Sequence, residues 1–110
     1  MRRFANVAAI FTFSVGVWAQ SISGRIAGTV TDASGGVVSK AAVRISNEGT
    51  GAERVLVSDP KGLFVASELP VGYYSVRISA PEFNEIERLH VKVDVGGETR
   101  VDASLSPKNL

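Results

Sequence analysis

The fold class is decided by the stretch Leu69-Pro70-Val71-Gly72-Tyr73-Tyr74-Ser75-Val76-Arg77-Ile78-Ser79, in which a turn leads into a strand. Proline and glycine at positions 70 and 72 are typical of turns, because each favours backbone angles that a turn requires. After the turn, apolar and polar side chains alternate with a period of two. That period is the signature of a β-strand with one face in an apolar core and the other in water.

The same alternation recurs on both sides of this stretch, and turn residues separate the runs at intervals of about 8–12 positions. No window carries a sustained helical period. Strands with one wet face and one dry face favour two antiparallel sheets packed on each other. We therefore expect an all-β sandwich of about seven strands, with Gly96-Gly97 joining the last two as a hairpin. The expected strands span residues 24–31, 43–46, 54–58, 63–66, 74–79, 89–95 and 100–105.

The alternation also predicts the core, whose centre we place at Val76, Ile78, Val91 and Val93. One spacing does not fit a regular strand, since Ile86 and Leu89 are an odd number of residues apart and cannot both point inward. A β-bulge or bend at positions 87–88 would bring both to the same face.

The first 19 residues have the layout of a signal peptide. Arg2 and Arg3 precede a mostly apolar run over residues 4–17, and Val17-Trp18-Ala19 fits a signal-peptidase site. The run is short for a membrane span, which needs about 20 residues. We expect cleavage between Ala19 and Gln20, a domain over residues 20–110, and export to the periplasm, outer membrane or extracellular space, with no membrane span in the mature form. A buried N-terminal helix or a retained anchor are the alternatives.

Composition excludes several kinds of site. The chain has no cysteine and one histidine, so neither a thiolate nor a pair of imidazoles is available to bind zinc or to attack a substrate. Without Arg2 and Arg3 the formal charge of +1 becomes −1, which is no electrostatic footprint for nucleic acid. We expect no catalytic residue, no metal, no cofactor and no nucleic-acid partner. His90, on the polar side of its strand, is interpreted as a solvated residue.

Three motifs in order resemble the carboxypeptidase regulatory-like domain. They are Gly28-Thr29-Val30-Thr31-Asp32-Ala33-Ser34-Gly35 with Ala42-Val43-Arg44-Ile45, then Asp59-Pro60-Lys61-Gly62-Leu63-Phe64, then residues 69–78 with Phe83. The resemblance implies a transthyretin-like Greek-key sandwich. It also implies a context, because this domain follows the signal peptide of many TonB-dependent outer-membrane receptors. Two positions depart from the family pattern: Glu82 stands where glycine is frequent, and Ser39-Lys40 replaces a common Pro-Gly.

Two functions of different classes follow from these observations. The first is a non-catalytic interaction or structural module, an extension or fragment related to a TonB-dependent receptor, that docks to receptor domains or another envelope protein. Val55-Leu56-Val57 is its candidate docking strand, because three consecutive apolar residues must expose apolar groups on one face. The alternative is a small carbohydrate-binding module of the starch-binding-like fold, with Tyr73 as the candidate platform for a sugar ring.

Overall fold

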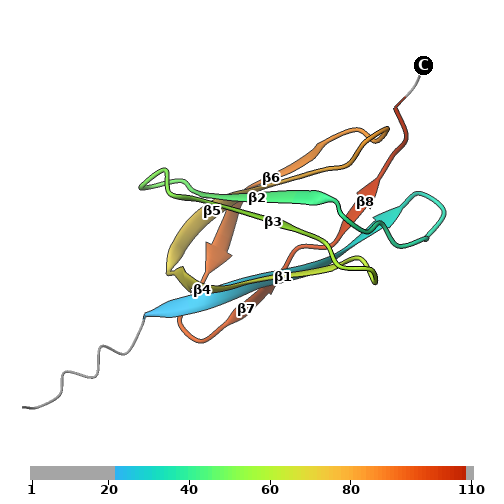
Figure 1. The fold of residues 1–110 in the computed structure, drawn as a ribbon. Helices are drawn as coiled ribbons and strands as arrows, with labels where there is room; N and C mark the ends of the chain where they lie inside the picture. The colour runs from blue at the N-terminus through green and yellow to red at the C-terminus, as the bar shows by residue number, and fades with distance from the viewer. Residues whose placement is uncertain (1–21, 109–110) are drawn as a thin grey trace, which may run out of the picture.

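The structure is a computed structural model and describes residues 22–108, so the predicted cleavage site at Ala19 and Gln20 lies outside the described residues. These residues form eight strands in two packed layers, and β1 begins at the end of the sandwich opposite to β8 (Figure 1). The prediction of an all-β sandwich is confirmed. The strands are β1 (Ser23–Asp32), β2 (Ala42–Asn47), β3 (Glu53–Val57), β4 (Leu63–Pro70), β5 (Gly72–Ser79), β6 (Ile86–Val93), β7 (Glu98–Arg100) and β8 (Ala103–Leu105).

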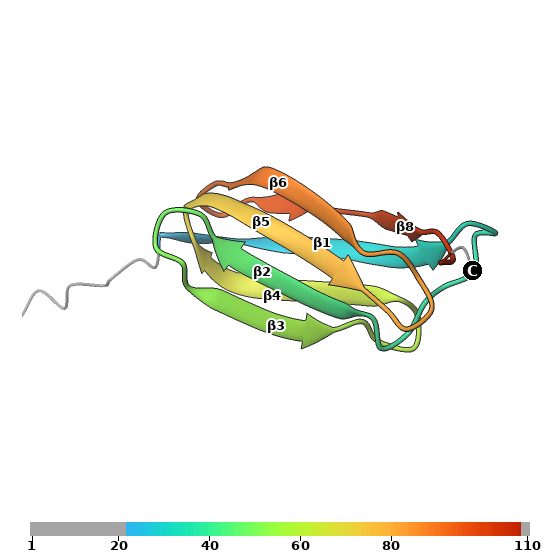
Figure 2. The same ribbon diagram turned by 90° about the horizontal axis from the view of Figure 1, so that it is seen from above.

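One sheet has the order β3-β2-β5-β6, so β3 and β6 are its two edge strands (Figure 2). The other has the order β4-β1-β7, with β8 also pairing with β1. The long strand β1 runs antiparallel to β4 but parallel to both β7 and β8. The expectation of purely antiparallel sheets was therefore wrong, because alternation of side chains reports a buried face and carries no information on strand direction.

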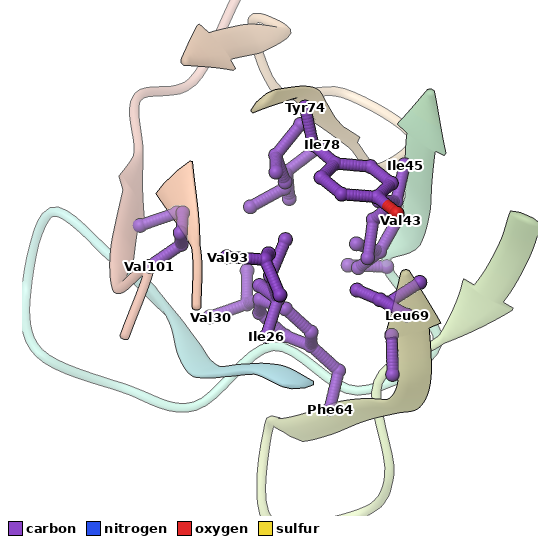
Figure 3. Packing of buried hydrophobic residues seen from close by; sticks show 14 of the residues in the cluster. Ile26, Val30, Val43, Ile45, Phe64, Leu69, Tyr74, Ile78, Val93 and Val101 are labelled. Atoms are coloured by element: carbon purple, nitrogen blue, oxygen red, sulfur yellow. The ribbon is translucent and has the colours of Figure 1, made fainter. Parts of the chain in front are cut away.

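The core lies between the two sheets and is built from the side chains that each sheet directs inward (Figure 3). Val76 and Ile78 are fully buried, and Val93 is 1% exposed, as predicted. Val91 packs against the core but is only half-buried. Phe64 and Tyr74, whose position in the alternation placed them inside, are also buried.

The last two predicted strands do not form a hairpin. Gly96 and Gly97 turn the chain away from β6, and the following strand joins the other sheet. The segment expected over residues 100–105 is divided into β7 and β8, with Val101 between them. Val101 donates its N–H to the carbonyl of Ala27 at 2.9 Å, so the connection lies directly against β1. This close contact with β1 needs glycine at position 28, because a Cβ there would lie 1.9 Å from the Val101 carbonyl oxygen.

Strand β6 contains a bulge, but not where we expected it. Tyr74 pairs with Val91 and Val76 pairs with Arg88, so two residues of β6, Leu89 and His90, stand opposite one of β5. The prediction of a bulge at positions 87–88 was wrong by two residues. Because the bulge follows position 88, Ile86 faces the core while Leu89 is 67% exposed. Val95, which was also expected on the dry face, is exposed in the turn after β6.

Both departures from the family pattern fall at left-handed backbone positions. Lys40 has φ of 60° and Glu82 has φ of 69°, a region that glycine enters without steric cost and that other residues enter at a cost. Glycine in the family pattern is thus explained by backbone geometry at both turns. This chain accepts the strain with larger side chains.

Candidate interaction surface and the aromatic pair

The candidate docking strand is the edge strand β3. Val55 and Val57 are 57% and 60% exposed, while Leu56 points inward and packs against the core. Leu56 pairs with the buried Val43 of β2, which fixes its side chain on the inner face. The pair of valines, and not the leucine, is therefore the apolar surface that this strand presents.

The backbone of β3 also offers unused hydrogen-bonding groups. Asn47 donates its N–H to the carbonyl of Ala52 at 2.7 Å. This hydrogen bond determines which residues of β3 turn their backbone groups toward β2. In an antiparallel pair the backbone groups of every second residue face the partner strand. The N–H and C=O groups of Glu53, Val55 and Val57 consequently point away from β2, toward an edge where no described strand lies.

The edge of β4, on the same side of the sandwich, is capped instead. Leu63 donates its N–H to the Asp59 carboxylate at 2.9 Å, and its carbonyl accepts the Asp59 N–H at 2.9 Å. The carbonyl of Ser67 accepts a hydrogen bond from the Arg54 guanidinium. Both outward backbone groups of Leu63 and the carbonyl of Ser67 are thus satisfied by neighbouring groups, and Val65 remains open between them. The two edges differ in backbone availability although both expose valine.

A hollow of about 160 Å³ lies beside the first residues of β3, between the two sheets. Its apolar lining comes from Ile45, Leu69, Pro70 and Tyr74, and the tyrosine hydroxyl is turned away to donate to the Pro70 carbonyl at 2.6 Å. Ala52 adds to the apolar lining, and the polar lining is supplied by Asn47, Thr50, Glu53 and Arg54. The hollow can accept an apolar group whose polar neighbours remain at the rim.

Tyr73, the candidate sugar platform, is not a free ring. It is 41% exposed, and the imidazole of His90 stacks on it with the ring centroids 3.9 Å apart and the planes 6° from parallel. His90 therefore occupies one face of the ring that a sugar would need. The imidazole itself remains open, with its side chain 70% exposed.

Glu48 holds His90 in this position. Its carboxylate accepts the backbone N–H of His90 at 2.7 Å and lies 3.1 Å from Nδ1 of the ring. The backbone hydrogen bond, and then the ring, lower the pKa of the Glu48 carboxyl. The same clamp stabilises the left-handed backbone of His90, whose φ is 59°.

The sequence-based interpretation of His90 as a solvated residue missed this contact. The separation of Ile86 and Leu89 by an odd number of positions was the one signal in the sequence that the strand is irregular near His90.

The described part of the chain holds no group of three or more histidine, cysteine, aspartate or glutamate side chains placed to bind a metal ion. Its charged residues form surface ion pairs, of which Arg77 with Glu87 at 2.6 Å and Arg100 with Asp102 at 2.8 Å are the shortest. Asp32 is a turn carboxylate, which accepts the N–H groups of Ser34 and Gly36 at 2.9 Å each. Within residues 22–108 no helix is long and apolar enough to cross a membrane.

Comparison with known families identifies the domain. The sequence pattern of the carboxypeptidase regulatory-like domain matches residues 25–106. The chain belongs to this family. Members of the carboxypeptidase regulatory-like family are non-catalytic domains, and the sandwich described above is the fold that the resemblance implied. No curated protein matches the chain.

Solved structures share the sandwich at low sequence identity. The Bacillus anthracis TIE protein has a TM-score of 0.64 and 17% identity, over 78% of this chain and 17% of that protein. A putative carbohydrate binding protein from Bacteroides uniformis has a TM-score of 0.63 and 20% identity, over 78% and 42%. Catechol 1,2 dioxygenase from Acinetobacter radioresistens has a TM-score of 0.63 and 13% identity, over 86% and 55%. The chain spans at most about half of these proteins, whose different descriptions show that the regulatory-like sandwich does not itself determine function.

Proposed function

We propose that this carboxypeptidase regulatory-like domain is an exported, non-catalytic module that docks to a protein of the cell envelope, in an assembly related to TonB-dependent receptors. The observation that carries the proposal is the β3 edge, which combines outward backbone groups with two exposed valines. An exposed apolar strand at a sheet edge is a template for protein contact unless it is blunted, and no described residue covers this one. The predicted signal peptide over residues 1–19 supports export.

Export is tested by expressing the full chain in a Gram-negative host and measuring the intact mass of the protein released from the periplasm. We expect the mature form to begin at Gln20. A periplasmic product that still carries Met1 would refute the predicted cleavage.

Docking is tested with two matched substitutions on neighbouring edges. Val55→Lys places a charge on β3 and Val65→Lys places one on β4, at side chains that are 57% and 56% exposed. Neither change buries a charge, so both variants should melt close to the unmodified domain. We expect only Val55→Lys to weaken co-elution with the plug and barrel of a TonB-dependent receptor from the same organism. Equal co-elution of all three proteins would contradict docking through β3, and no co-elution of the unmodified domain would contradict the receptor relation.

Carbohydrate binding is the second candidate, and the observation that favours it is the half-exposed stack of Tyr73 and His90. Aromatic and imidazole rings can pack against the apolar face of a sugar. The test is isothermal titration with maltoheptaose and with cellohexaose, comparing the unmodified domain with Tyr73→Ala. Binding that Tyr73→Ala abolishes would establish this function in place of protein docking. We expect no heat of binding, because His90 covers one face of the tyrosine.

A further inference from the structure

We infer that the partner docks by strand addition: an extended, acidic segment of another polypeptide pairs with β3, becomes the fifth strand of its sheet, and places one apolar side chain in the hollow beside Arg54. The inference rests on the proposed docking function and specifies its geometry and the chemistry of the partner. Three independent features of the described residues converge on it: backbone groups, the hollow and charge.

The backbone groups select β3 over the other edge on the same side. Glu53, Val55 and Val57 direct their N–H and C=O groups outward, and among the described residues these groups have no hydrogen-bond partner. On β4 the equivalent groups of Leu63 and Ser67 are already bonded to Asp59 and Arg54. An incoming strand gains a full set of main-chain hydrogen bonds at β3, whereas at β4 it would first have to displace the capping groups.

The hollow gives the added strand a place for one of its side chains. Residues of the new strand alternate between the two faces of the sheet, so the residue opposite Arg54 lies on the inner side, where the hollow begins. A volume of about 160 Å³ resembles the cavities of about 150 Å³ that accept a benzene ring, so a leucine, isoleucine or phenylalanine side chain fits. The neighbouring residues of the new strand then face outward beside Glu53 and Val55.

Charge determines which strand fits. Lys40, Arg54 and Lys61 form no ion pair among the described residues. Lys40 bonds through its N–H to Ser58, immediately after β3, and Lys61 lies in the turn that follows. Three carboxylates are near: Glu53 pairs with Arg44, Asp59 bonds to the backbone of its own turn, and Glu68 follows Ser67, which Arg54 contacts. Four basic side chains, of Lys40, Arg44, Arg54 and Lys61, thus stand against three acidic ones, and this positive excess beside β3 favours a partner strand that carries aspartate or glutamate.

The probe for the test is the peptide acetyl-Asp-Thr-Leu-Thr-Val-Asp-amide, titrated into the isotopically labelled exported protein and followed by amide chemical shifts. We expect saturable binding, with the largest shifts at Val55, Val57 and the lining of the hollow. Replacing both aspartates of the peptide with lysine should weaken binding at least tenfold. The affinity of the acidic peptide should fall with added salt, because screening weakens exposed charge attraction.

Two matched proline variants test the main-chain pairing. Val55→Pro removes an outward N–H from β3 without removing a hydrogen bond to β2, and Val65→Pro does the same on β4. We expect Val55→Pro to weaken peptide binding about tenfold, and Val65→Pro to leave it unchanged. Peptides that are N-methylated on alternate residues check the same point with the unmodified protein. Methyl groups on the set that faces β3 should abolish binding, and methyl groups on the other set should not.

Several results would overturn strand addition. They are the absence of shifts at about 5 mM peptide, equal loss in the two proline variants, no effect of N-methylation, or shifts centred on Tyr73 and His90. A concentration-dependent dimer in light scattering that the peptide does not dissociate would show that a second copy occupies β3 instead. If the peptide fails while Val55→Lys still weakens co-elution with the receptor, docking stands and its geometry is different. If both fail, both proposals are wrong.

Discussion

Replacing Gly28 with alanine tests the feature that organises the mixed sheet, the close contact of β1 with the segment between its two parallel partners, β7 and β8. A Cβ at this position would lie 1.9 Å from the carbonyl oxygen of Val101 and 2.8 Å from Cζ of the Phe64 ring. Gly97 provides the matched control. A Cβ there would have its nearest contact, the Asp94 carbonyl oxygen, at 3.5 Å, and its backbone is not left-handed.

The expected cost follows from what must move. The Val101 carbonyl would have to retreat from 1.9 Å to at least 3.4 Å, and a backbone group cannot do so without carrying its neighbours. The retreat breaks the hydrogen bond from Val101 to Ala27, worth about 1 kcal/mol. It also withdraws the buried Val101 side chain from the core, for about 2 kcal/mol more. We expect Gly28→Ala to lower the free energy of unfolding by about 3 kcal/mol, and Gly97→Ala to change it by less than about 0.5 kcal/mol.

Urea unfolding of the exported protein, followed by circular dichroism and by tyrosine fluorescence, measures both values. The two signals should give one transition for the unmodified domain, which permits a two-state analysis. If Gly28→Ala is too unstable to purify, its failure to fold beside a normal Gly97→Ala agrees with the expectation. A Gly28→Ala protein within about 1 kcal/mol of the original would show that the segment between β7 and β8 does not approach β1 closely at this glycine.

Three further predictions concern burial, pH and backbone strain. Val76→Ala should lower the free energy of unfolding by about 2 kcal/mol, because it removes two methyl groups from the core. Val57→Ala, at a side chain that is 60% exposed, should lower it by less than about 0.5 kcal/mol. Equal urea midpoints for the two variants would contradict the strand register. Because the His90 clamp lowers the folded-state pKa of Glu48, its stabilisation is complete above the unfolded-state pKa and disappears as the pH falls through the folded-state pKa. The difference in unfolding midpoint between the original domain and Glu48→Gln should therefore shrink on acidification below pH 5, and a constant difference would refute the clamp. Glu82→Gly should raise the free energy of unfolding by about 0.5–1 kcal/mol by removing left-handed strain, and a lower melting temperature would contradict that explanation.

The sequence predicts the faces of the strands well because burial imposes a local rule. In β1, β2, β5 and β8 the apolar side chains that recur at every second residue are buried in the core, as the alternation predicts. Alternation alone does not distinguish one kind of sandwich or barrel from another, and the family motifs indicated which of these folds the chain adopts. The turn carboxylates Asp32 and Asp59 follow the same local logic, because their hydrogen bonds are made within four residues along the chain.

The errors arise where long-range contacts override the local rule. The spacing of Ile86 and Leu89 predicts a bulge but not its position: Glu48, more than 40 residues earlier, holds the bulge at His90, and Leu89 is exposed. The split between β7 and β8 likewise depends on Gly28, which lies more than 70 residues before Val101. Neither the contact of Tyr73 with His90 nor the parallel pairing could be obtained from spacing, since both depend on which strands become neighbours in space.

The choice of β3 as the docking edge illustrates the same limit at the level of function. Val55-Leu56-Val57 and Leu63-Phe64-Val65 have the same pattern, an inward large residue between two exposed aliphatic ones, and their outer valines are almost equally exposed. Hydrophobicity therefore cannot explain why one strand would bind a partner and the other would not. The difference comes from polar groups outside the pattern, because Asp59 caps Leu63 and Arg54 caps Ser67 while the outward groups of β3 have no such neighbour. Arg54 belongs to β3 itself, so the strand that covers the edge of β4 leaves its own edge open.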